Sequence, residues 1–146
     1  MKVVLQRVSQ ARVTVAGEVV GEIGSGLLLL VGFGQGDSEA CIAPMIEKIT
    51  TLRVFPNDDK RFDRSVLDAE GSVLAVSQFT LYADTSKGRR PEFFQALNPG
   101  EAQVLFERFL DALRNAGISK VASGVFGAHM LVESINDGPV TITLER

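Results

Sequence analysis

Hydrophobic residues recur along this chain with two periods, and their order predicts many strands and two helices. Strands are predicted where apolar residues alternate with polar ones or run together, over residues 2–8, 12–15, 18–23, 27–33, 52–55, 72–81, 120–125, 128–134 and 140–144. Ala16 and Gly17 supply a tight turn between the second and third of these strands. The result is an α/β alternation with an excess of strand.

The first helix is predicted after Asp37, which has the side chain of an N-cap. Apolar residues then recur at helical spacing, at Ile42, Met45, Ile46, Ile49 and Leu52. Pro44 is compatible with this helix only because it lies near the first turn. We expect the helix to pack on the sheet.

The second helix has the clearest signals in the chain. Asn98 is placed as N-cap, Pro99 as the first helical residue and Glu101 as the third, and Gly117 lies just past the end. One face is apolar and consists of Ala102, Leu105, Phe106, Phe109, Leu110 and Leu113. The polar stretch at residues 56–61 and the residues that follow it form the best candidate for a mobile loop.

Length and composition place all of residues 1–146 in one domain. The chain is 45% hydrophobic, which suffices for one buried core. Its longest apolar run, residues 27–31, is bounded by Gly26 and Gly32 and is far shorter than a membrane span. The N-terminus has a strand pattern in place of a signal peptide, so a cytoplasmic protein is expected. The single cysteine, Cys41, excludes an internal disulfide.

The formal charge of −3 argues against a protein that holds nucleic acid through a broad basic face. A local contact remains open, because Lys87, Arg89 and Arg90 concentrate three cations around Gly88 and would meet a few phosphates. The alternative is a solvated loop tip.

Several motifs resemble functional sites, but their residue types or spacing do not fit those sites. The glycines at residues 32–36 are spaced too closely for a dinucleotide loop, and a turn is the better interpretation. His129 has no second His or Cys at ligand spacing, and acidic loop residues such as Asp58, Asp59 and Asp63 are usually only solvated. Cys41 has no base nearby in sequence and is interpreted as a small buried residue. No metal and no cofactor are expected.

Two segments remain as candidates for a site, because each places polar groups where a strand begins or ends. The first is Ser77, Gln78, Phe79 and Thr80, in which Gln78 and Thr80 would point to one side of a pleated strand. The second is the turn that contains Gly138 and Pro139. Ordinary strand and turn residues are the alternative for both segments.

These two segments match those of the D-aminoacyl-tRNA deacylases, and the similarity extends from residues 1–8 to the last strand. The resemblance implies a three-layer α/β/β fold with mostly antiparallel strands and two main helices. It implies that Ser77, Gln78, Phe79 and Thr80 form the floor of a pocket. It also implies a homodimer in which a cis Gly138–Pro139 enters the partner's pocket. The implied substrate is the ester between an amino acid and the terminal ribose of tRNA.

Ester hydrolysis of this kind needs donors aimed at the carbonyl oxygen as it gains charge, and backbone N–H groups near Phe79 and Thr80 would supply them. Thr80 itself is a weak nucleophile, because the sequence shows no base to activate it. The ribose 2′-hydroxyl is therefore the favoured assisting group, with Gln78 holding the ester.

A fixed Gly138–Pro139 would reject L side chains by lack of room, so many D residues and glycine should be accepted. Phe126 and Met130 are candidate walls of an adenosine pocket, although core packing fits them equally well. Arg7 is a candidate support for the Gly138–Pro139 loop, although a surface or ion-paired arginine is the alternative.

Two other classes of function stay open. One is a module that binds an RNA end or a D-amino acid without chemistry, which an assay of hydrolysis would distinguish from an esterase. The other is a structural dimer that uses residues 87–90 as its contact loop. In that case, mutation of Gln78 or Gly138 should leave its activity in cells intact.

Overall fold

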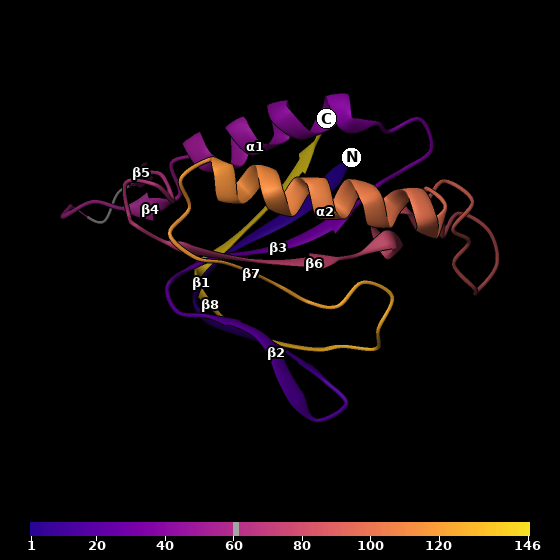
Figure 1. Ribbon diagram of the computed structural model, residues 1–146, viewed down its shortest axis with the longest axis horizontal. Helices are drawn as coiled ribbons and strands as arrows, with labels where there is room; N and C mark the ends of the chain where they lie inside the picture. Colours follow the sequence, from indigo (N-terminus) through magenta and orange to yellow (C-terminus); the bar gives the residue numbers. More distant parts are fainter. Residues whose placement is uncertain (60–61) are drawn as a thin grey trace.

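Two helices cover one face of a six-stranded sheet, and part of that sheet folds back beneath it as a second β layer (Figure 1). The computed structural model describes residues 1–59 and 62–146. The strands are β1 Lys2–Val15, β2 Glu18–Ile23, β3 Gly26–Gly32, β4 Phe55–Pro56, β5 Phe62–Arg64, β6 Ser72–Ser77, β7 Val121–Ser123 and β8 Leu131–Glu145. The helices are α1 Ile42–Thr51 and α2 Pro99–Asn115, with short 3₁₀ turns η1 Glu39–Cys41 and η2 Phe79–Tyr82. The predicted three-layer α/β/β arrangement is confirmed.

The long strand β1 organises the sheet because it has three partners. Its first half pairs with β3 and its second half with β2, while β8 runs antiparallel along most of its other edge. β6 pairs in parallel with β3 and with β7, and all other pairs are antiparallel. The predicted predominance of antiparallel strands is therefore confirmed.

The two faces of β3 and β6 are buried against different layers. On one face, Leu27 and Leu29 pack with both helices in the larger core. On the other face, Leu28 and Leu74 pack against residues of β1 and β2 in a smaller core. Burial on both faces explains the continuous apolar run of β3, since a strand between two layers needs no polar face.

Close approach between two strands also explains why residue 26 is a glycine. A Cβ at Gly26 would overlap the Ser72 carbonyl oxygen, where β3 and β6 begin side by side. In contrast, a Cβ at Gly24 would meet no atom within 4 Å.

Several predicted strand boundaries are wrong. Residues 2–8 and 12–15 form one strand, as do 128–134 and 140–144 together with the turn between them, except that β8 begins only at Leu131. The predicted strand at residues 52–55 reduces to β4, which forms a small hairpin with β5. Of the predicted loop at 56–61, Pro56 belongs to β4 and residues 58 and 59 form a turn, while Lys60 and Arg61 lie outside the described residues.

The predicted helix α2 is confirmed in detail. The Asn98 side chain accepts a hydrogen bond from the Glu101 N–H at 3.1 Å, and Pro99 opens the helix. For α1 the predicted N-cap is wrong: Cys41 occupies that position, and Asp37 instead binds groups outside the helix. Among the described residues, no helix is long and apolar enough to cross a membrane.

Candidate active site

Ser77 is the last residue of β6, where it lies beside Val31 of β3. The chain leaves the strand at Gln78, whose N–H still donates to the Val31 carbonyl at 2.7 Å. The prediction that the strand continues to residue 81 is wrong, because residues 79–82 form the turn η2. Gln78 and Thr80 therefore do not share one side of a pleated strand.

η2 nevertheless brings the two side chains together, and the Gln78 amide donates to the Thr80 hydroxyl. A 3₁₀ turn leaves its first backbone N–H groups without carbonyl partners inside the turn, and these belong to Phe79 and Thr80. The Gln78 side chain does not cap them. Two backbone donors thus lie at the point where the chain leaves the sheet.

A polar cluster behind η2 holds the turn in place. The Asp37 carboxylate accepts hydrogen bonds from the Gly34 N–H at 2.7 Å, from the Tyr82 hydroxyl at 3.2 Å and from the Met1 ammonium at 2.8 Å. Burial, followed by the charge of Asp37, raises the pKa of Tyr82 well above its usual value. The phenol therefore stays protonated and keeps donating to Asp37.

An open cavity of about 630 Å³ lies over the end of β6. It brings together five of the residues predicted from the sequence: Ser77, Gln78, Phe79, Phe126 and Met130. Thr80 lies just outside the lining. Phe126 lines this cavity, and its ring also packs against Phe106 of α2 with centroids 6.2 Å apart.

Among the lining residues that sequence reasoning missed are Phe93, Asn98 and His129. Phe93 packs edge-on against Phe79, with ring centroids 5.0 Å apart. His129 lies before β8 and not inside a strand as predicted. The helix cap at Asn98 was visible in the sequence, but its place in the wall depends on how α2 packs.

Gly138 and Pro139 lie in an exposed bulge of β8, joined by a cis peptide bond. Gln6 pairs with Thr141 and Val8 with Asn136, so the single residue Arg7 faces residues 137–140. The base of the bulge is fixed by the Asn136 amide, which accepts from the Val140 N–H at 2.8 Å and donates to the Val140 carbonyl at 3.2 Å.

Arg7 is buried and holds this bulge from below. Its Nε donates to the Asp137 carbonyl at 2.9 Å, and a terminal nitrogen donates to the Val54 carbonyl at 2.6 Å. The same Nε lies 3.1 Å from the Asp137 carboxylate. The predicted contact with the loop is present. Of the two alternatives, a surface arginine is wrong, because Arg7 is buried, whereas an ion-paired arginine is correct, because the pair with Asp137 is present.

Within one chain, the bulge and the cavity are far apart. The cavity wall reaches Val132, and Gly138 lies six residues further along β8. At about 3.3 Å per residue, this separation is roughly 15–20 Å. Gly138 and Pro139 therefore do not belong to the cavity of their own chain.

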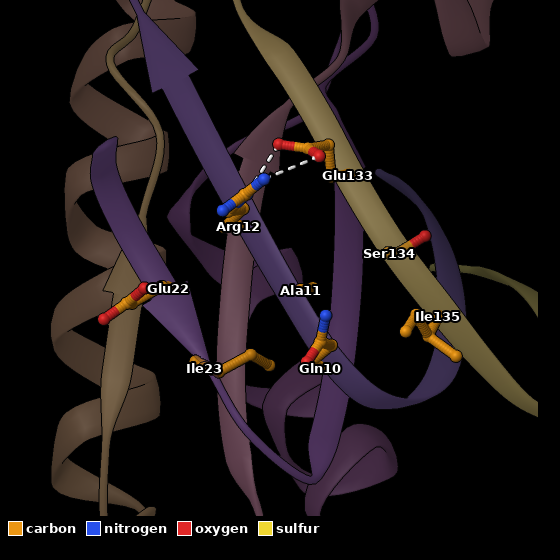
Figure 2. A pocket seen from close by; sticks show the side chains of 8 residues that line it. All are labelled: Gln10, Ala11, Arg12, Glu22, Ile23, Glu133, Ser134 and Ile135. Atoms are coloured by element: carbon orange, nitrogen blue, oxygen red, sulfur yellow. Dashed lines mark hydrogen bonds and ion pairs between the residues drawn. The ribbon is translucent and has the colours of Figure 1, made fainter. Parts of the chain in front are cut away.

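A second hollow of about 510 Å³ lies on the face formed by β1, β2 and β8. Figure 2 shows the Arg12 side chain of β1 directed to Glu133 on the neighbouring strand β8, with Ile23 and Ile135 among the other residues that line the hollow. Hydrogen bonding and attraction to Arg12 lower the pKa of Glu133. None of the residues predicted for the site lines this hollow, and Ile135 is 53% exposed.

Metal-ligating side chains do not gather at either hollow. Within residues 1–59 and 62–146 no group of three or more His, Cys, Asp or Glu is placed to hold an ion. Cys41 is only half-buried, which corrects the predicted burial, and burial raises the pKa of its thiol.

Known proteins are similar to this chain over nearly its whole length. Residues 4–145 match the model of the family described as D-Tyr-tRNA(Tyr) deacylase. The chain is 54% identical to a D-aminoacyl-tRNA deacylase of Roseiflexus sp. (strain RS-1), over 99% of this chain and 93% of that protein. It is 50% identical to a D-aminoacyl-tRNA deacylase of Pelobacter propionicus, over the whole of both chains.

Two solved structures share the fold. One, described as c-Myc DNA Unwinding Element Binding Protein, is 41% identical with a TM-score of 0.94 and covers 100% of this chain and 99% of its own. The other, a probable eukaryotic D-amino acid tRNA deacylase, is 20% identical with a TM-score of 0.85, and covers 98% of this chain and 97% of its own. The family match spans nearly the whole sequence, and this chain therefore belongs to the D-Tyr-tRNA(Tyr) deacylase family.

Proposed function

We propose that this protein hydrolyses the ester bond of D-aminoacyl-tRNA and releases the D-amino acid and free tRNA. The observation that carries the proposal is the cavity at the end of β6, where Ser77, Gln78 and Phe79 lie beside backbone donors, in a chain of this family. Relatives at 50% identity or more carry the name D-aminoacyl-tRNA deacylase. The direct test is release of amino acid from D-tyrosyl-tRNA compared with L-tyrosyl-tRNA. Comparable rates for the two would contradict the proposal.

The chemistry assigned to the cavity is stabilisation of the ester carbonyl oxygen. The N–H groups of Phe79 and Thr80 donate to that oxygen as charge develops, and one such donor contributes about 2.7–4 kcal/mol. Gln78 holds the ester beside them. The neighbouring ribose 2′-hydroxyl assists the reaction, because Thr80 is exposed and its hydroxyl is contacted by an amide, which is not a base.

One altered substrate and one variant distinguish this 2′-hydroxyl-assisted mechanism from a mechanism in which Thr80 is the nucleophile. A substrate that ends in 2′-deoxyadenosine should react about 100-fold or more slowly, as expected for loss of a proton-transferring group. Thr80→Ala should keep near-normal turnover. Complete loss of activity in Thr80→Ala, with unchanged fold and substrate binding, would favour the nucleophile instead.

Selection against L residues is assigned to Gly138 and Pro139, contributed by a second copy of the chain. The separation of bulge and cavity within one protomer supports this, and so does the geometry of β8. Among the described residues β8 pairs only with β1, so its other edge is open. A two-fold axis near Ile135 would place Gly138 of the partner subunit beside Val132 of the cavity wall.

Exchange of subunits between two variants tests the shared site. Gln78→Ala removes a group of the cavity and should be inactive. Gly138→Ala displaces the bulge, because a Cβ there would lie 2.6 Å from the Val140 nitrogen, and should hydrolyse L-tyrosyl-tRNA as well as D-tyrosyl-tRNA. A mixed dimer of the two has one wild-type site, in which the cavity of the Gly138→Ala protomer receives the bulge of the other protomer. In an equal mixture about half of the Gly138→Ala protomers are in such dimers, so hydrolysis of L-tyrosyl-tRNA should fall by about half. No decrease, in a mixture shown to exchange subunits, would place each site within one chain.

The assembly itself is tested at Ile135. Ile135→Asp puts a charge into the proposed interface and should give a monomer by light scattering, with loss of selection against L-tyrosyl-tRNA. Val19→Asp is the matched control, because Val19 is 50% exposed on β2 and outside that interface. An Ile135→Asp protein that is dimeric and still selects against L-tyrosyl-tRNA would contradict the proposed axis.

The same reasoning extends to the range of substrates. An L side chain is rejected by lack of room, so glycine, which has no side chain, is accepted and glycyl-tRNA is a second substrate.

Phe126 and Met130 form walls for the terminal adenosine. The proposed place of action is the cytoplasm, where the tRNA is charged.

The alternative is a module that binds a nucleic-acid end without hydrolysing it. One structural relative is named for binding a DNA element, which gives this alternative a specific basis. Binding of D-tyrosyl-tRNA without release of the amino acid would favour it.

A further inference from the structure

The segment between η2 and α2 extends beyond the sheet as a loop beside the N-terminal end of α2 (Figure 1). We name residues 84–94 the basic arm. Its two strands are joined at the base by paired hydrogen bonds, from the Asp84 N–H to the Glu92 carbonyl at 2.8 Å and from the Glu92 N–H to the Asp84 carbonyl at 2.9 Å. The Asp84 carboxylate also accepts from the Ser86 N–H at 2.8 Å. The arm is therefore a closed hairpin.

Charge is segregated along the basic arm. Its carboxylates, Asp84 and Glu92, lie at the base, and its cations, Lys87, Arg89 and Arg90, lie at the tip. In the part of the chain that the structure describes, none of these three cations lies within 4 Å of a carboxylate oxygen. Three unpaired cations within four residues form a strong local positive charge in a protein whose net charge is −3.

The basic arm is fixed to the cavity at its C-terminal end. Phe93 lines the cavity and packs against Phe79. The Gln35 side chain donates to the Phe94 carbonyl, and the Gln35 N–H donates to the Gln95 carbonyl at 2.9 Å. Phe94 belongs to this anchored segment, yet it is 75% exposed.

An exposed aromatic ring and unpaired cations on one loop form an arrangement that binds single-stranded nucleic acid, since bases stack on rings and phosphates attract cations. We propose that the basic arm binds the single-stranded 3′ end of the RNA that carries the ester. Phe94 stacks on the base that precedes the terminal adenosine, and Lys87, Arg89 and Arg90 contact phosphates of the same strand. This inference rests on the proposed deacylase function, because it assigns the RNA outside the cavity to a specific surface.

Two substrates isolate the contribution of the basic arm. D-tyrosyl-tRNA has the full acceptor end, whereas the D-tyrosyl ester of adenosine alone ends at the cavity. A triple variant, Lys87→Ser with Arg89→Ser and Arg90→Ser, should lose activity on the tRNA and keep it on the adenosine ester. The slope of log(kcat/KM) against log[salt] for the tRNA should flatten by about 0.7 per cation, or about 2 for the triple variant.

The aromatic contact is measured separately. Phe94→Ala should lower kcat/KM on the tRNA by roughly 5- to 150-fold, which corresponds to the contribution of one stacked base. Phe94→Tyr should restore it, because the ring is retained. The matched control for charge is Lys120→Ser, since Lys120 is an exposed cation at the opposite end of β6 from Ser77.

The outcomes distinguish the inference from the function on which it rests. If the wild-type protein hydrolyses neither substrate, the proposed function fails. If it hydrolyses both, and the arm variants match wild type on both, the function stands and the basic arm has no role in RNA binding. Equal losses on both substrates would also overturn the inference, because they would mean that the arm supports the cavity and not the RNA.

Discussion

Replacement of Arg7 by methionine should destabilise the protein by about 3 kcal/mol. The guanidinium makes two hydrogen bonds to backbone carbonyls, those of Asp137 and Val54. Hydrogen bonds to a charged group each contribute about 1.5–3 kcal/mol. Methionine fills a similar volume but leaves both acceptors without a donor, and relief of the cost of burying a charge offsets only part of this loss.

Two control variants separate the possible causes. Asp137→Asn removes the carboxylate that lies 3.1 Å from Arg7 but keeps the backbone carbonyl, and this carboxylate is 55% exposed. Arg114→Met breaks a shorter ion pair, 2.7 Å to Asp111, in which both side chains are more than half exposed. Each control should cost less than about 1 kcal/mol, because exposed ion pairs contribute little.

The assay is thermal unfolding at one fixed protein concentration, since association would otherwise shift the midpoint. For a chain of this size, 3 kcal/mol corresponds to a decrease in Tm of about 6–12 °C. Arg7→Met should also react faster with L-tyrosyl-tRNA relative to D-tyrosyl-tRNA, because the bulge loses its support. If Arg7→Met unfolds within 2 °C or so of Arg114→Met, the hydrogen bonds to the bulge do not have the assigned strength.

Three further predictions concern other residues of the fold. Asn98→Ala should destabilise the protein by about 1 kcal/mol in urea unfolding through loss of the α2 cap, and an unchanged midpoint would contradict this. Gly26→Ala should cost about 1–3 kcal/mol, because the obstacle is the Ser72 backbone, whereas Gly24→Ala, with open space around it, should be neutral in the same assay. Cys41 should react with iodoacetamide half-maximally at a higher pH than a free thiol does, because its raised pKa leaves less thiolate at any given pH; a midpoint at or below that of glutathione would refute this.

Features set by neighbouring residues were predictable from the sequence. Helix α2 is the clearest example, because Asn98, Pro99 and Glu101 act within a single turn. The apolar alternation of Val140, Ile142 and Leu144 likewise gave the correct inward face for the end of β8.

Features set by distant contacts were not predictable in this way. The pairing of β1 with β8 continues across bulges on both strands, so segments that look separate in sequence form single strands. Residues 79–81 have strand-like side chains, yet the chain turns there, and Asp37 holds Tyr82 at the end of that turn. Asp37 resembles a helix cap in sequence because its bonds to Met1 and Tyr82 appear only in three dimensions.

The same distinction between neighbouring and distant contacts applies to the residues of the candidate site. Sequence analysis could predict three residues of the cavity, Ser77, Gln78 and Phe79, because they lie in a segment that resembles the family. Phe93 and His129 enter the cavity only through the packing of loops that no local pattern describes.

The pairing of β1 with β8 also governs when the protein becomes active during its synthesis. Residues 2–15 must wait for residues 131–145 to be translated before this pair can form completely, which takes roughly 7–26 seconds at typical elongation rates. Until then one edge of β1 remains open to chaperones or to other nascent chains. A partly made chain has neither its bulge nor the β8 side of its cavity, so the cavity is complete only once residues 131–145 have been made.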